Sequence, residues 1–335
     1  MTRAPLVCSL VLALYHPFCT PAVAPTLPPW EAPLAELWQR PADLASRDLF
    51  NGPWGAEHAP DPDDTYTFIQ RKQQGTNPGI TVRDSRGREW HVKQPPHNDQ
   101  GAEGPIEVAL SRVLSAVGYH QPPVYFLPSL TISDGKQTHV EPGGRFRLTE
   151  KSLQHAGDWS WQQNPFVGMR PYQGLLVILL MFNSSDVKNE NNALYDVKAP
   201  GQSPTRWYVV RDLGTALGET GKLAPQRGDA DIFEREPFIK DIKDGLVHFN
   251  YHGWHQELFA RISPDDVAWA SELLAGLTDR QWSDAFRAAA YPPAIADRFI
   301  GRLHQKIAEG RQLADVNTSS RGTLPLPRRP TGGRK

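Results

Sequence analysis

The segment from Asp186 to Val197, with the sequence DVKNENNALYDV, brings a carboxylate, an ammonium group and several side-chain amides together within a few positions. Transfer of a phosphoryl group needs such groups: a carboxylate beside the acceptor hydroxyl, a cation facing the phosphate oxygens and oxygen ligands for a metal ion. Asparagine-rich segments are also common in polar surface turns. The composition of this segment alone therefore leaves both interpretations open.

Three further charged residues could complete such a site. Lys93 ends the strand-like segment EWHVK, Glu107 lies in the first turn of the helix-like segment that follows, and Asp212 opens a D-L-G tripeptide after the strand-like segment RWYVV. Each has an ordinary explanation when it is taken alone, because lysine is common on solvated strands and an acidic residue favours the N-terminus of a helix. Their order along the chain, rather than any single residue, indicates a catalytic site.

Two of these motifs carry a resemblance to a known family. DVKNEN resembles the D-L-K-x-E-N core of the protein-kinase catalytic loop, and RDLG resembles the D-F-G element of that family. In outline, residues 66 to 310 resemble the divergent members of the kinase-like superfamily, such as the HipA-type, phosphoinositide-kinase-like and secretory-pathway kinases. The segments NPFVG and DVKNENN also resemble those of an uncharacterised family of exported bacterial proteins.

The resemblance implies a Mg²⁺-dependent, ATP-type phosphotransferase whose acceptor, a protein or a small molecule, is unknown. It assigns Asp186 to orienting or deprotonating the acceptor hydroxyl, and Lys188 to offsetting charge on the transferred phosphoryl group. Asn191 and Asp212 are expected to hold Mg²⁺.

The resemblance also implies a nucleotide-binding region in the N-terminal half of the chain. Lys93, positioned by Glu107, is expected to hold the α- and β-phosphates of ATP. The turn QGTNPG is expected to cover the phosphates, with Gly75 and Gly79 as its flexible points.

The chain departs from the protein-kinase pattern in several places. Ser184 and Ser185 stand where protein kinases have His-Arg, no G-x-G-x-x-G is present, and no A-P-E follows Asp212. These departures keep two alternatives open. One is a catalytically inactive kinase-like binding module of the cell envelope, and the other is a nucleotidyl transferase on the same fold.

The elements that must position these residues are predicted from periodicity and turn residues. Alternating segments separated by turns predict an antiparallel three-stranded meander with a helix after its third strand. Pro105 and Gly118 suit the start and the end of that helix. The predicted strands are residues 66–72, 80–84, 89–94, 122–132, 145–151, 192–197 and 206–212, and the predicted helices are residues 104–119, 172–182, 264–277, 279–290 and 293–313.

This pattern predicts an α+β, two-lobed kinase-like fold, in which an antiparallel-sheet N-lobe with one helix faces a mainly helical C-lobe across a cleft. The N-lobe is expected to span residues 65–165 and the C-lobe residues 166–315. An extended segment rich in Pro and Trp, residues 25–64, precedes them. A disordered basic tail, residues 316–335, is expected to follow.

The N-terminus has the features of a secretory leader. Arg3 precedes an apolar run, and the small-x-small sequence AVA at 22–24 predicts a signal peptide over residues 1–24. The run is too short to span a bilayer, so we expect no transmembrane anchor and an exported protein, periplasmic or secreted. Both cysteines, Cys8 and Cys19, lie in this leader. The net charge of −1 provides no field that would favour nucleic acid, so we expect no nucleic-acid partner.

Overall fold

The protein is described by a computed structural model, in which residues 32–72, 77–96, 103–198, 205–223 and 225–321 are placed. Over these residues the chain forms a mixed α+β fold. The predicted signal peptide (1–24), Gly75 and the end of the predicted tail (322–335) lie outside the described residues. Among the helices of the described part, none has the length and apolar character that crossing a membrane requires.

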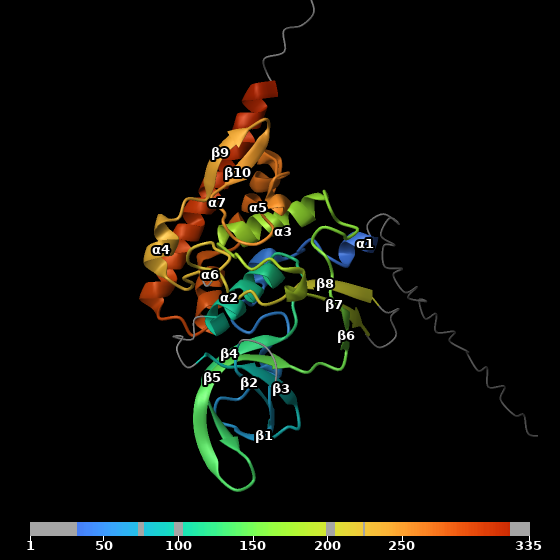
Figure 1. Ribbon diagram of the computed structural model, residues 1–335, viewed down its shortest axis with the longest axis vertical. Helices are drawn as coiled ribbons and strands as arrows, with labels where there is room; N and C mark the ends of the chain where they lie inside the picture. Colours follow the sequence, from blue (N-terminus) through green and yellow to red (C-terminus); the bar gives the residue numbers. More distant parts are fainter. Residues whose placement is uncertain (1–31, 73–76, 97–102, 199–204, 224, 322–335) are drawn as a thin grey trace, which may run out of the picture.

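Five strands close into a barrel at one end of the molecule (Figure 1). They are β1 (Thr65–Arg71), β2 (Gly79–Arg83), β3 (Glu89–Lys93), β4 (Val124–Ser133) and β5 (Thr138–Leu148), in the order β1-β2-β3-β5-β4. The antiparallel meander β1-β2-β3 predicted from the sequence is confirmed. A parallel pairing of β1 with β4, which was not predicted, closes the barrel. Alternate side chains, among them Tyr66, Val82, Trp90 and Phe146, fill its apolar interior.

One helix, α2 (Glu103–Ala116), lies between β3 and β4 in the chain and packs between the barrel and the helical part of the protein. It packs against β4 and β5 on one side and against α6 (Asp279–Ala288) on the other. Nearly all of its side chains are therefore buried. Glu103 and Glu107 share one face of its first turns, because residues four apart on a helix are neighbours. The helix thus presents two carboxylates to the end of β3.

A second sheet consists of β6 (Leu153–Gly157), β7 (Asn192–Val197) and β8 (Thr205–Val210). β7 and β8, which were both predicted as strands, pair as a hairpin, whereas β6 was not predicted. Because β6 pairs with β7, this sheet joins residues on both sides of position 165, where the sequence placed a domain boundary. The end of β8 leads directly into Arg211 and Asp212.

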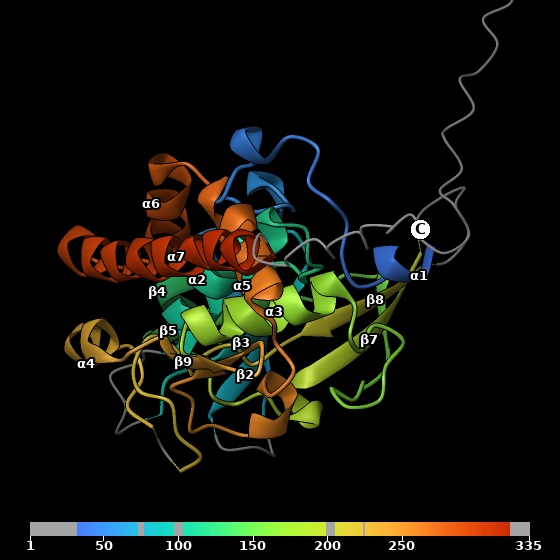
Figure 2. The same ribbon diagram turned by 90° about the horizontal axis from the view of Figure 1, so that it is seen from above.

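Helices α5 (Pro264–Ala275) and α7 (Pro293–Arg321) pack against α3 (Arg170–Met181), whose side chains are almost all buried. Helices α5 and α6 each begin at a capping box, in which the Ser263 and Thr278 side chains accept from the backbone of the first turn. Figure 2 shows α7 beside α5 and α6, which it contacts. The other elements are α4 (Ala230–Arg235), β9 (Ile239–Lys243) and β10 (Leu246–Phe249).

Helix α7 overlaps the start of the predicted tail. It continues to Arg321 and so includes residues 316–321, and the rest of the tail lies outside the described residues. The segment after Leu313 contains neither glycine nor proline before position 322, and the sequence therefore offers no signal that would end the helix earlier.

The N-terminal segment packs against the body of the protein through two of its tryptophans. It contains the short helix α1 (Ala32–Ala35). The indole of Trp38 donates a hydrogen bond to the carbonyl of Val117 (2.8 Å), and that of Trp54 donates to Gln121 (3.1 Å). Both acceptors follow α2, so the segment holds the end of this helix in place.

Candidate functional site

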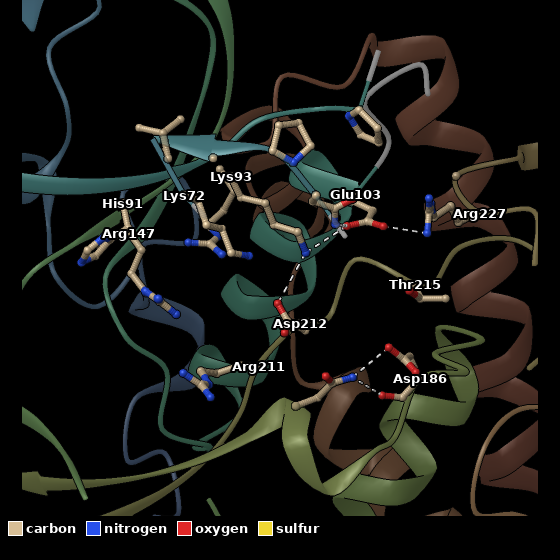
Figure 3. A pocket seen from close by; sticks show the side chains of 18 of the residues that line it. Lys72, His91, Lys93, Glu103, Arg147, Asp186, Arg211, Asp212, Thr215 and Arg227 are labelled. Carbon is tan, nitrogen blue, oxygen red and sulfur yellow. Dashed lines mark hydrogen bonds and ion pairs between the residues drawn. The ribbon is translucent and has the colours of Figure 1, made fainter. Parts of the chain in front are cut away.

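A cavity of about 1750 Å³ opens between the outer face of β2, β3 and β5 and the loops that follow α3 and β8 (Figure 3). Basic side chains outnumber acidic ones along its wall. The basic residues are Arg71, Lys72, Lys93, Arg145, Arg147, Lys188, Arg211, Lys222 and Arg227, and the acidic residues are Glu103, Asp186, Asp212 and Asp229. Such a wall favours an anionic ligand.

The floor of the cavity is determined by strand register. Lys93 on β3 pairs directly with Arg145 on β5, and His91 pairs with Arg147. Because side chains two residues apart on a strand point to the same face, all four lie on the outside of the barrel. The apolar residues between them, Val92 among these, point into the barrel core.

Lys93 lies among three carboxylates. Its Nζ atom is 2.9 Å from Glu103 Oε2, 3.4 Å from Asp212 Oδ1 and 3.7 Å from Glu107 Oε2. The predicted Lys93–Glu107 ion pair is therefore present, but Glu103 is nearer to the ammonium group. Sequence reasoning missed Glu103, although its position four residues before Glu107 places both on one helical face.

Glu107 has a second partner. Its Oε1 atom is 2.9 Å from Nε of Arg145, and both side chains are less than 10% exposed. Glu107 is not among the residues that line the cavity, whereas Arg145, Lys93 and Glu103 are. Glu107 therefore lies behind the cavity floor and neutralises two of its cations.

Lys93 and Asp212 each stabilise the charged form of the other. Burial lowers the pKa of Lys93, but Glu107, Asp212 and Glu103 outweigh this effect, so the pKa lies above its usual value. Burial raises the pKa of Asp212, but Lys93, Arg145 and Arg211 outweigh it, so the pKa lies below its usual value. Both side chains are consequently charged at neutral pH.

The local backbone geometry explains why Asp and Gly stand in the D-L-G tripeptide, residues 212–214. Asp212 has a left-handed backbone (φ 51°), a conformation that Asp adopts more readily than most residues. A Cβ atom at Gly214 would lie 2.9 Å from both Cβ and the carbonyl oxygen of Glu103. Glycine at 214 therefore lets the start of α2 approach the loop that carries Asp212.

Hydrogen bonds join the loop that carries Asp186 to the loop that carries Asp212. The Ser185 backbone N–H donates to the carbonyl of Thr215, and the Leu217 N–H donates to that of Phe182. Asn183, which has a left-handed backbone, donates its amide to the Gly218 carbonyl (2.6 Å). These bonds place both loops along one wall.

A buried lysine supports this arrangement from behind. Lys306 on α7 is fully buried, and its Nζ atom donates to the Met181 carbonyl (2.9 Å) and to Asn183 Oδ1 (2.8 Å). The Phe233 ring lies 4.2 Å from the same nitrogen. Lys306 therefore satisfies the Met181 carbonyl at the end of α3, which the helix itself leaves without a partner.

Lys188 and Asn191, which were predicted to share the site with Asp186, both contact its carboxylate. Lys188 Nζ lies 2.7 Å from Asp186 Oδ1, and the Asn191 amide donates to Asp186 Oδ2 (2.9 Å) and to its carbonyl (2.7 Å). Lys188 also lies over the ring of Trp254, at 4.8 Å. Figure 3 shows Asp186 on one side of Asp212, with Thr215 close by.

The donor set suits a hard cation such as Mg²⁺. The Asn191 nitrogen is used by Asp186, and no described residue donates to its side-chain oxygen, which leaves this oxygen and the Asp212 carboxylate as ligands. Within the described residues no group of three or more His, Cys, Asp or Glu side chains could hold a metal ion. Amide and carboxylate oxygens are donors that Mg²⁺ prefers, and oxygens of a bound phosphate and of water would supply the remaining ligands.

Of the two glycines predicted to cover the phosphates, Gly79 begins β2 and lines the cavity. Gly75 lies outside the described residues. The sequence also gave no indication of Arg145, Arg147 and Arg227, which line the same cavity.

Comparisons with known proteins give a distant structural likeness. No family model matches the chain, and no curated protein matches its sequence. Among solved structures, the chain is similar to the Helicobacter pylori proinflammatory kinase CtkA, with a TM-score of 0.38 and 11% sequence identity over 78% of this chain and 99% of that one. We draw no functional inference from a likeness this distant.

Proposed function

We propose that the protein is a kinase-like phosphotransferase that binds Mg²⁺ and a nucleoside triphosphate such as ATP. In this proposal the barrel with α2 is one lobe, the helical part is the other, and the cavity is the cleft between them. One observation carries the proposal. Lys93, Asp186, Asn191 and Asp212, which come from separate segments of the chain, line one cationic cavity, and the Lys93 ammonium lies 3.4 Å from the Asp212 carboxylate.

The residues around Lys93 are suited to holding the phosphate chain. Glu103 and Glu107 hold the lysine ammonium at the end of β3, where it can donate to phosphate oxygens. Asp212 and Asn191 would hold Mg²⁺. The ion, when bound, would neutralise charge on the bridging and terminal phosphate oxygens.

Asp186 would act on the acceptor. Its carboxylate would accept the proton of the acceptor hydroxyl as that oxygen bonds to phosphorus and the bond between phosphorus and the leaving oxygen breaks. Asn191 holds this carboxylate through its amide. Lys188, now 2.7 Å from Asp186, would turn to the transferred phosphoryl group and offset its charge.

We also propose that the protein acts outside the cytoplasm, after removal of residues 1–24, on a protein or small-molecule acceptor. The leader-like sequence at the N-terminus motivates this proposal. Intact-mass measurement of protein from envelope and medium fractions tests it, and full-length protein found only in the cytosol would contradict it.

Transfer of label tests the central proposal. The purified protein is incubated with Mg²⁺ and with ATP labelled at the γ- or the α-phosphate, with Asp212→Ala as a control. We expect label from the γ-position only, on the protein itself or in released phosphate, and only in the presence of the metal. Label from the α-position would instead indicate nucleotidyl transfer. Absence of both, together with absence of nucleotide binding, would favour the non-catalytic binding module.

A further inference from the structure

The floor of the cavity has two rows of side chains that differ in charge balance. The first row runs across β2, β3 and β5 through Gly79, Lys93 and Arg145, and the second runs through Thr81, His91 and Arg147. The cations of the first row are neutralised by Glu103 and Glu107. Among the described residues no carboxylate forms an ion pair with the second row, so its charge balance differs from that of the row beside it.

Arg147 supplies the positive charge of the second row. Its half-buried guanidinium makes no hydrogen bond or ion pair with any side chain in the described part of the protein, although it lines the cavity. Burial lowers its pKa, and repulsion by Arg145 and by Arg211 lowers it further. A guanidinium that is surrounded by like charge and partly removed from water is costly unless an anion binds it.

Arg211 adds a second guanidinium from the end of β8. It donates to the Asn192 carbonyl (3.1 Å) and lies 3.7 Å from Asp158. Its Nε atom is buried without a hydrogen-bond partner among the described residues. Figure 3 shows Arg147 and Arg211 on the side of Asp212 away from Asp186.

His91 completes the group as a neutral donor or acceptor. Its Nδ1 atom lies 3.2 Å from the Thr81 hydroxyl. Burial lowers the pKa of His91, and Arg147 lowers it further, so the ring is neutral at pH 7. The ring therefore adds a polar contact to the second row without adding to its positive charge.

We propose that Arg147, Arg211 and His91 form a second phosphate subsite, which takes a phosphate other than the one transferred. This inference rests on the proposed function and specifies its ligand. Because the subsite lies across Asp212 from the expected acceptor position, the phosphate lies on the side of the donor, carried either by the ribose of the donor nucleotide or by a second phosphorylated molecule. Two guanidinium groups suit the several oxygens of a phosphate monoester.

The size and polarity of the cavity agree with this ligand. Its volume of about 1750 Å³ exceeds the roughly 300 to 1,000 Å³ of an ordinary small-molecule pocket. Such pockets are lined mainly by apolar side chains, which suit an uncharged base. Here the strand face beyond Lys93 presents Thr81, His91 and Arg147 instead.

Binding measurements with three probes test the subsite: ATP, ATP bearing a 3′-phosphate, and inorganic pyrophosphate, each titrated with Mg²⁺ into the wild type and Arg147→Gln. Arg83→Gln is the matched control, because Arg83 lies further along β2 on the same face, is half exposed and does not line the cavity. We expect Arg147→Gln to weaken binding of the 3′-phosphorylated nucleotide on the order of tenfold to a hundredfold. Binding of ATP should change little, and Arg83→Gln should change neither.

The outcomes separate this inference from the proposed function. If both nucleotides bind Arg147→Gln as they bind the wild type, the subsite is refuted and the proposed function stands. If no nucleotide binds but pyrophosphate binds the wild type and not Arg147→Gln, the proposed function fails and the subsite stands. If pyrophosphate binds the ATP-loaded wild type but not the ATP-loaded variant, the phosphate comes from a second molecule rather than from the ribose. Unfolding of Arg147→Gln at or above the wild-type temperature shows that the variant is folded.

Discussion

The ammonium group of Lys93 lies 3.4 Å from the carboxylate of Asp212, although 119 positions separate the two residues in the chain. The end of β3 and the exit from β8 converge at this contact. Each charge holds the other in its ionised form, so that the pKa of Lys93 is raised and that of Asp212 is lowered. Without a ligand Lys93 is the counterion of Asp212. In the proposed function a metal ion would take that place, and Lys93 would then be free to bind phosphate.

We predict from this contact that Asp212→Ala abolishes Mg²⁺-dependent nucleotide binding. Nucleotide at about 100 times its Kd should stabilise the wild type by about 2.7 kcal/mol, which a thermal shift detects. The variant should show no shift, because its metal ligand is missing. Asp196→Ala is the control, since Asp196 pairs with Arg206 on the exposed β7–β8 hairpin, outside the cavity. A normal shift in Asp212→Ala would contradict the role of Asp212.

Asp186 should behave differently from Asp212. Asp186→Asn keeps a side chain of the same shape but cannot accept the acceptor proton. We expect nearly unchanged nucleotide binding and a rate of transfer reduced by about 10² to 10⁴-fold, the usual contribution of a general base. Single-turnover transfer from γ-labelled nucleotide measures the rate, and the thermal shift measures the binding. If Asp186→Asn loses nucleotide binding as well as the rate of transfer, Asp186 holds the nucleotide instead.

The two glutamates of α2 should differ in their effect on stability. Glu107→Gln removes the charge opposite the buried Arg145, and an unpaired buried cation costs on the order of 3 kcal/mol. Glu103→Gln should cost less, because Lys93 keeps Glu107 and Asp212 as partners, and Arg227, which also pairs with Glu103, is more exposed than Arg145. Urea denaturation of the two variants measures the difference in the free energy of unfolding. An equal or reversed order would show that Glu107 is not the main support of the cavity floor.

The sequence predicts the elements better than the contacts between them. Strand alternation and helical periodicity depend on neighbouring residues, so β1, β2, β3 and α2 were located within a few positions. The parallel closure of β1 on β4 joins segments far apart in the chain, and no local signal indicates it. β6 was missed for the same reason, because its pairing with β7 is what makes it a strand.

The same distinction holds for the candidate site. Asp186 and Asp212 were identified because each lies in a short motif, and Lys93 because it ends a strand that precedes a helix with an acidic first turn. The structure places all three along one cavity. Arg145 and Arg147 were missed, because only the register of β5 against β3 brings them beside Lys93 and His91. Their roles depend on tertiary pairing, which a strand sequence such as RFR does not reveal.

Lys306 is a further residue that only the structure identifies, and its burial should make the stability of the protein depend on pH. Burial lowers the pKa of Lys306 well below its ordinary value. The unfolded chain therefore binds a proton that the folded protein lacks, at every pH between the folded-state value and about 10.5. Over that window the contribution of Lys306 to stability rises with pH, by about 1.4 kcal/mol per unit.

We therefore predict that the stability of the wild type relative to Lys306→Met increases between pH 7 and pH 9.5. Methionine has similar length but no ionisable group, so the change in pH leaves its contribution unchanged. Urea denaturation of both proteins at the two pH values gives the difference in the free energy of unfolding. A difference that stays constant would show that Lys306 is charged in the folded protein, held by the Met181 carbonyl, Asn183 and the ring of Phe233. In either case Lys306→Met should slow phosphoryl transfer, because the lost hydrogen bonds release the end of α3, from which the Asp186 loop begins.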